Sequence, residues 1–148
     1  MKKKKELKKA DVLSEDKVKE YVIKWLSRND YGDFTYGDKK DRGPDIKAKK
    51  NGYGVYYIIE AKKEGATAPL NDNYFLNSLG QIITRMNVGK RTKYSYGLAL
   101  PEKSAKIALR RIPWQVCEKL NLRVLMVSKD GTVKEYKPKD IKKEQEKK

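Results

Sequence analysis

Two carboxylates and a lysine in the middle of the chain, Asp45, Glu60 and Lys62, are residue types that could do chemistry together. Glu60 and Lys62 follow an apolar run over 55–59 that is typical of a strand covered on both faces. Because they are two residues apart, their side chains project from the same face of that strand. Asp45 lies on the preceding segment, where antiparallel pairing could bring it beside Glu60. We therefore expect the three side chains to converge on one small patch.

A patch of this kind suits Mg²⁺, which prefers oxygen ligands and retains exchangeable waters; Mn²⁺ is expected to substitute. The chain contains no histidine, which excludes His-dependent hydrolases and nucleases and HEXXH metalloenzymes. Chemistry must therefore use carboxylates, lysine and a metal bound through oxygen. Such a metal can stabilise the charge of a phosphodiester transition state and activate a water, while Lys62 positions that water or neutralises the phosphate.

Gly43-Pro44-Asp45, an interval of fifteen residues, and Glu60-Ala61-Lys62 resemble the PD-(D/E)XK motif of restriction-endonuclease-like nucleases. The resemblance implies a mixed central β-sheet flanked by helices, with a core in the order α-β-β-β-α-β, and it covers about residues 14–100. It also implies Mg²⁺-dependent hydrolysis of DNA phosphodiester bonds. In that reading Asp45 and Glu60 are metal ligands, and Lys62 is the catalytic lysine.

The sequence leaves two assignments of acidic residues open. Many members of the family carry a glutamate on the first helix that reaches the metal. Glu20 is the best match here, and the resemblance implies that it is a catalytic residue and a metal ligand. Glu15 is the alternative. On a lysine-rich helix, however, such an acid is commonly only an ion-pair partner of neighbouring lysines. Asp45 depends on the register of the hairpin, and the nearby Asp41 could replace it if the turn is longer than Asn51-Gly52 indicates.

The helix after the lysine strand supplies another candidate. In several branches of the family a glutamine on this helix approaches the site, and Gln81 is the matching residue here. Tyr74, Ser78, Gln81 and Arg85 form a polar stripe beside an apolar one, which favours a functional role over ordinary helix surface.

The excess of positive charge in the sequence indicates the kind of molecule that the protein binds. The chain has 36 Lys and Arg against 20 Asp and Glu, a net charge of +16, which favours a polyanion such as DNA. Candidate DNA contacts are Arg85 and the basic loop with Lys90, Arg91 and Lys93, although such a loop is also typical of a solvated turn.

The surrounding pattern predicts the elements that position these residues. Ser14 caps a helix over 15–28, and Asn51-Gly52 indicates a type I′ hairpin turn. Strands are predicted over 33–36, 45–48, 54–62, 94–100, 122–127 and 132–136, and further helices over 73–87, 104–110 and 113–120. The order indicates an α/β sandwich around a mixed sheet, with an extra C-terminal helix and hairpin. Residues 11–137 form a single domain, and the lysine-rich tails 1–10 and 138–148 are expected to be flexible.

The sequence disfavours disulfide-bonded secreted proteins and membrane proteins. The single cysteine, Cys117, permits no internal disulfide, and no apolar run approaches a membrane span, so we expect a soluble cytoplasmic protein without a membrane partner. The leading hypothesis is a homodimeric DNA endonuclease. Its rivals are a resolvase of four-way Holliday junctions and a catalytically inactive nucleic-acid-binding module of the same fold.

Overall fold

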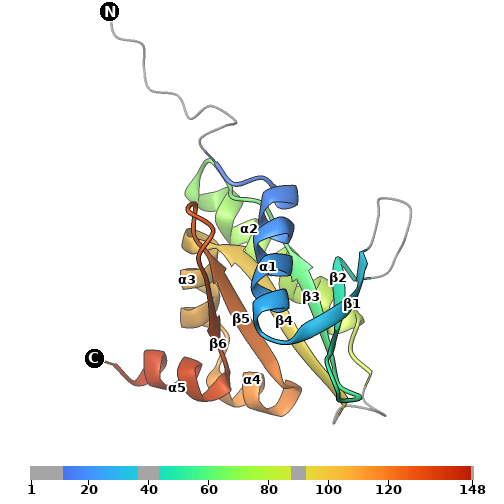
Figure 1. Ribbon diagram of the computed structural model, residues 1–148. Helices are drawn as coiled ribbons and strands as arrows, with labels where there is room; N and C mark the ends of the chain where they lie inside the picture. The colour runs from blue at the N-terminus through green and yellow to red at the C-terminus, as the bar shows by residue number, and fades with distance from the viewer. Residues whose placement is uncertain (1–11, 37–43, 88–92, 148) are drawn as a thin grey trace, which may run out of the picture.

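The computed structural model describes residues 12–36, 44–87 and 93–147, which form one six-stranded mixed sheet with helices on both faces (Figure 1). The strands lie in the sheet in chain order, β1 to β6. The elements are α1 (Glu15–Arg28), β1 (Tyr31–Tyr36), β2 (Ile46–Lys50), β3 (Tyr56–Ala61), α2 (Ala68–Thr84), β4 (Tyr94–Pro101), α3 (Glu102–Arg111), α4 (Trp114–Leu120), β5 (Leu122–Val127), β6 (Val133–Tyr136) and α5 (Pro138–Glu146).

The strand directions follow from the connections. Strands β1, β2 and β3 pair in sequence as an antiparallel meander, and a turn at 128–132 joins β6 antiparallel to β5. Helices connect β3, β4 and β5, which are parallel, as crossover connections require. The predicted mixed α/β architecture is confirmed, and the first six elements have the expected α-β-β-β-α-β order.

Each face of the sheet has its own core. α1 covers one face with Val18, Val22 and Leu26, and the remaining helices pack on the other face (Figure 1). Strand alternation supplies both cores, since Ile59 points toward α1 while Ile58 points away from it. Within the described part of the chain, no helix is both long and apolar enough to cross a bilayer.

The bounds of α1 agree with the prediction because its end signals are local. Ser14 Oγ accepts a hydrogen bond from Lys17 N at 3.1 Å, and Glu15 and Asp16 lie in the first turn, where acids complement the helix dipole. The helix therefore needs no distant contact to begin where it does.

Helix α2 differs from the prediction in both its start and its orientation. It begins at Ala68 because Thr67 caps it, with Leu70 N donating to Thr67 Oγ1 at 3.3 Å. Ser78, from the predicted polar stripe, is fully buried, whereas Ile83, from the predicted apolar face, is 49% exposed. The helix is thus turned so that part of its polar stripe faces the sheet.

The prediction of a flexible tail over 138–148 is wrong for residues 138–146, which form α5 against α3 and α4. Ile141 is fully buried there. Gln145 Nε2 donates to Leu109 O at 2.9 Å and to Ile112 O at 2.6 Å, and Gln145 Oε1 accepts from Trp114 N at 3.0 Å. One apolar residue and one amide therefore anchor a segment whose composition is typical of a solvated tail.

Replacing Gln145 with alanine is expected to destabilise the protein by about 2 kcal/mol, because it leaves backbone groups at the ends of α3 and α4 without partners. Chemical denaturation measures this loss. Gln115→Ala, on an exposed position of α4, is the matched control and should change stability by less than about 0.5 kcal/mol. Equal effects from the two variants would contradict an anchoring role for Gln145.

Candidate active site

The pairing of β2 with β3 brings Asp45 and Glu60 together. Ile46 lies opposite Ile59, so the next pair outward is Asp45 with Glu60. Asp45 Oδ2 accepts a hydrogen bond from Ala61 N at 2.8 Å, which fixes the aspartate against the end of β3. The Asp45 carboxyl group lies close enough to Glu60 for its negative charge to raise the pKa of Glu60. Two carboxyl groups thus share one small space at the end of a central strand.

The turn between β2 and β3 sets this register, and it is longer than predicted. Lys50 N donates to Val55 O at 2.9 Å, so four residues, 51–54, form the turn. Gly52 has φ +79°, the left-handed conformation that favours glycine. A two-residue turn at 51–52 would have placed Gly43 opposite Glu60. The longer turn selects Asp45, and the alternative Asp41 lies outside the described residues.

Glu60 is buried and has one cationic partner. Its side chain is 2% exposed, and its Oε2 accepts from Arg85 Nε at 2.9 Å. Burial raises the pKa of Glu60, the hydrogen bond from Arg85 opposes this rise, and the negative charge of Asp45 adds to it. Arg85, predicted as a DNA contact, therefore lies at the acid pair itself.

Lys62 lies just beyond the end of β3. Its backbone N–H donates to Ala99 O at 3.2 Å, as part of the pairing of Ala61 with Ala99 that ends the ladder with β4. Lys62 is half-buried, and its predicted position on the face of Glu60 depends on strand alternation continuing one residue beyond β3. The adjacent Lys63 is exposed, and its Nζ lies 5.9 Å from the centre of the Tyr74 ring.

On α1, Lys19 is the residue that reaches the pair. Its Nζ lies 3.7 Å from Asp45 Oδ1 and 3.4 Å from Glu15 Oε2. The sequence reasoning missed Lys19, although its spacing from Val22 and Leu26 places it beside the buried stripe. Leu13 N donates to the side-chain Oε1 of Glu64 and Glu64 N donates to Leu13 O, both at 2.9 Å, and these bonds hold the start of α1 beside the loop after Lys62.

The structure does not bring Glu20 to this site. Its carboxylate is 45% exposed and lies 3.2 Å from Lys24 Nζ and 3.5 Å from Lys17 Nζ. Glu20 is therefore an ion-pair partner of neighbouring lysines on the surface of α1. Glu15, the alternative position, is linked to Asp45 through Lys19.

The remaining candidates are spread over the molecule. Gln81 is half-buried on α2, one turn before Arg85, and its backbone carbonyl accepts from Thr84 Oγ1 at 2.7 Å. Lys90 and Arg91 lie outside the described residues. Lys93 is exposed immediately before β4, which is the end of the sheet away from Glu60.

The donor set fits a hard divalent cation. Asp45 and Glu60 offer adjacent carboxylate oxygens, and their mutual repulsion when both are ionised favours a cation between them. Among residues 12–36, 44–87 and 93–147, no group of three or more His, Cys, Asp or Glu is placed to hold a metal. Water and substrate oxygens would therefore complete the coordination of an ion held by these two carboxylates.

Comparisons of the chain with protein-family models, with curated proteins and with solved structures give no match. Cys117 is not a candidate catalytic residue, because burial raises the pKa of its thiol to about 11 and leaves it a poor nucleophile.

The raised pKa of Glu60 predicts a pH dependence of stability. As the pH rises above the ordinary value of 4.5, the unfolded chain ionises Glu60 first, so this residue's contribution to stability falls until the pH passes the raised pKa. In EDTA, the melting temperature of Glu60→Gln relative to wild type is therefore expected to increase from about pH 4 to pH 7. Thermal denaturation at each pH measures the difference.

Glu20→Gln is the control for this measurement. Hydrogen bonding to Lys24 and the charge of Lys17 lower the pKa of Glu20, so its contribution has the opposite sign. A Glu60→Gln difference that is constant with pH, or that decreases as the pH rises, would contradict the proposed environment of Glu60.

Proposed function

We propose that this protein is a Mg²⁺-dependent DNA endonuclease with a restriction-endonuclease-like fold. The observation that carries the proposal is the register of β2 and β3, which puts Asp45 opposite Glu60 near the end of β3, with Lys62 two residues further along the chain. The element order α-β-β-β-α-β around these residues supports it. The motif supports it as well, because its residues are brought together although fifteen positions separate them.

Each residue then has a role that follows from its environment. Asp45 and Glu60 hold the metal through oxygen, and the hydrogen bond from Ala61 N orients Asp45 for that purpose. When bound, Mg²⁺ neutralises both carboxylates, stabilises negative charge on the scissile phosphate and makes a water easier to deprotonate. Lys62 holds the phosphate or the attacking water from the Glu60 face.

Arg85 and Lys19 are the cations that contact the pair in the described structure. Arg85 Nε occupies one oxygen of Glu60, and an arginine at this position can also donate to a phosphate oxygen. We propose that Arg85 balances the charge of Glu60 in the free protein and contacts the DNA backbone in the complex.

The proposed substrate is double-stranded DNA, and the proposed assembly is a homodimer. A net charge of +16 favours a polyanion through the release of counterions. The chain has one pair of motif carboxylates, so cutting both strands at one position would use two chains.

The test is cleavage of supercoiled plasmid, linear duplex, single strands and a four-way junction in Mg²⁺, in Mn²⁺ and in EDTA. We expect nicking or linearisation of plasmid in either metal and none in EDTA. Preferential cutting of the junction would favour a resolvase. DNA binding without cleavage of any substrate would show a binding module and overturn the enzymatic proposal.

A further inference from the structure

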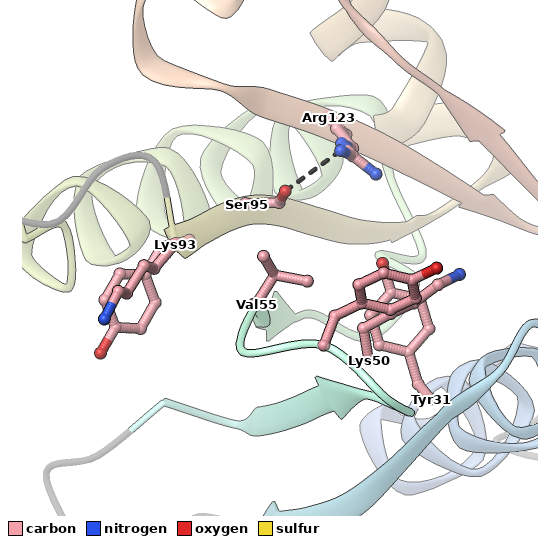
Figure 2. Close-up of a pocket in the computed structure, with 8 residues that line it drawn as sticks. Tyr31, Lys50, Val55, Lys93, Ser95 and Arg123 are labelled. Carbon is pink, nitrogen blue, oxygen red and sulfur yellow. Dashed lines mark hydrogen bonds between the residues drawn. The ribbon is translucent and has the colours of Figure 1, made fainter.

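A second site lies at the other end of the sheet, where a cleft of about 400 Å³ opens between the β2–β3 turn and the start of β4 (Figure 2). Val55, on its floor, precedes β3, whereas Glu60 is near the end of that strand. Five residues of extended chain separate the two positions by about 17 Å. The eight residues that line the cleft are Tyr31, Lys50, Tyr53, Val55, Lys93, Tyr94, Ser95 and Arg123.

The charge of the cleft is positive. Lys50 and Lys93 lie on opposite sides of Val55 (Figure 2). Lys50 Nζ donates to Asn29 O at 3.1 Å and lies 4.8 Å from the centre of the Tyr31 ring, two contacts that hold the ammonium without neutralising it. None of the eight lining residues is acidic. An anion entering the cleft would therefore meet two lysines and no opposing carboxylate on its walls.

Arg123 forms a fixed wall of the cleft. Its Nη2 donates to Ser95 Oγ at 3.1 Å (Figure 2). Its Nη1 donates to Glu135 Oε2 at 2.9 Å. The buried Tyr57 hydroxyl also donates to Glu135 Oε2, at 3.0 Å, behind this wall. Because Glu135 balances the charge of Arg123, the two lysines supply the uncompensated charge.

Three tyrosines add aromatic surface. Tyr31 packs against Tyr57 with ring centres 5.7 Å apart, and Tyr94 is stacked on Tyr56 at 5.6 Å, so both are held in place. Tyr53, on the turn, is 65% exposed, and its ring has room to stack on a flat ligand. Tyrosine rings beside lysines are the combination with which proteins bind a base and its phosphate.

We propose that this cleft binds a nucleotide unit, with phosphate held by Lys50 or Lys93 on the two sides of the cleft and the base against a tyrosine ring. The unit belongs either to a single-stranded segment of nucleic acid or to a free nucleotide, and the experiment below distinguishes these sources. The proposal does not depend on cleavage, because the cleft and the acid pair lie at opposite ends of β3.

The test is the binding of a fluorescein-labelled oligothymidylate to the full chain, followed by anisotropy in EDTA at fixed salt. Lys50→Gln with Lys93→Gln is expected to weaken binding at least about tenfold. Lys139→Gln with Lys143→Gln removes the same charge from exposed positions on α5 and should weaken binding no more than about twofold. Equal losses from the two pairs would overturn the proposal, since charge alone would then account for binding.

Tyr53→Ala tests the base contact at an exposed position where folding is not at stake. It is expected to weaken oligothymidylate binding about fivefold or more, the effect of removing one stacking ring, and unchanged binding would overturn the proposed base contact. Displacement of the probe by thymidine monophosphate would identify a free nucleotide as a sufficient ligand. Displacement only by unlabelled oligothymidylate would identify a strand.

Inorganic phosphate completes the competition series. If it displaces the probe as well as thymidine monophosphate does, the cleft recognises an anion and not a nucleotide, which overturns the proposal. Absence of binding by the wild-type chain would overturn it as well. Because metal is absent throughout, none of these outcomes depends on whether the protein cleaves DNA, which the metal-dependent assays decide separately.

Discussion

Glu60→Gln is expected to reduce Mg²⁺-dependent DNA cleavage by at least about a hundredfold while leaving the protein folded. The amide keeps the shape of the side chain, and its oxygen can still accept a hydrogen bond from Arg85. It removes the negative charge that would hold the metal beside Asp45. Initial rates of plasmid nicking measure the loss, and the melting temperature shows that the fold remains.

Glu20→Gln is the control for this experiment. Glu20 is an exposed acid on α1, paired with Lys17 and Lys24, and the structure does not bring it to the acid pair. Its substitution should leave the nicking rate within about threefold of wild type. If Glu20→Gln lost as much activity as Glu60→Gln, the proposed metal site would be assigned to the wrong residues.

Lys62→Met is expected to reduce cleavage by about a hundredfold or more, through loss of the charge that would stabilise the phosphate or position the water. Methionine retains most of the apolar stem, so packing at the end of β3 should change little. Mg²⁺ binding, followed by the metal-induced rise in melting temperature, should remain, because both carboxylates remain. The defect is therefore expected in the cleavage rate and not in the affinity for metal.

Lys63→Met is the matched control, since it removes the same charge one residue further along the chain. The Lys63 side chain is exposed, and its ammonium lies over the Tyr74 ring of α2, where no carboxylate of the acid pair contacts it. Cleavage by this variant should stay within about threefold of wild type. Equal losses at the two positions would indicate a general effect of charge on DNA binding and no specific role for Lys62.

The position of Glu60 was predictable because it depends on short-range periodicity. The apolar run before Glu60 indicates a strand covered on both sides, and β3 is such a strand, with Glu60 near its end. The bounds of α1 were predictable for a similar reason, since Ser14 and the two acids after it satisfy the start of that helix locally.

The register of the β2–β3 hairpin and the rotation of the helices about their axes were not predictable in the same way. Several turn lengths and helix orientations are nearly equal in local energy, and packing against distant segments selects one of them. Asn51-Gly52 is compatible with a turn of two or of four residues, and only the paired strands select the longer turn that places Asp45 opposite Glu60. On α1, the contact with the sheet directs Lys19 to Asp45 and leaves Glu20 in solvent.

The same distinction applies to the helices on the other face. Ser78 becomes buried and Ile83 half-exposed because α2 rotates to fit the sheet, although the apolar pattern favoured the reverse. Helix α5 forms because Ile141 and Gln145 find partners on α3 and α4, which are distant in sequence. Local pattern was thus sufficient for the identity of the chemical groups and the order of the elements. Long-range packing determined which of those groups meet, because contacts between distant segments have no signature in the sequence of either one.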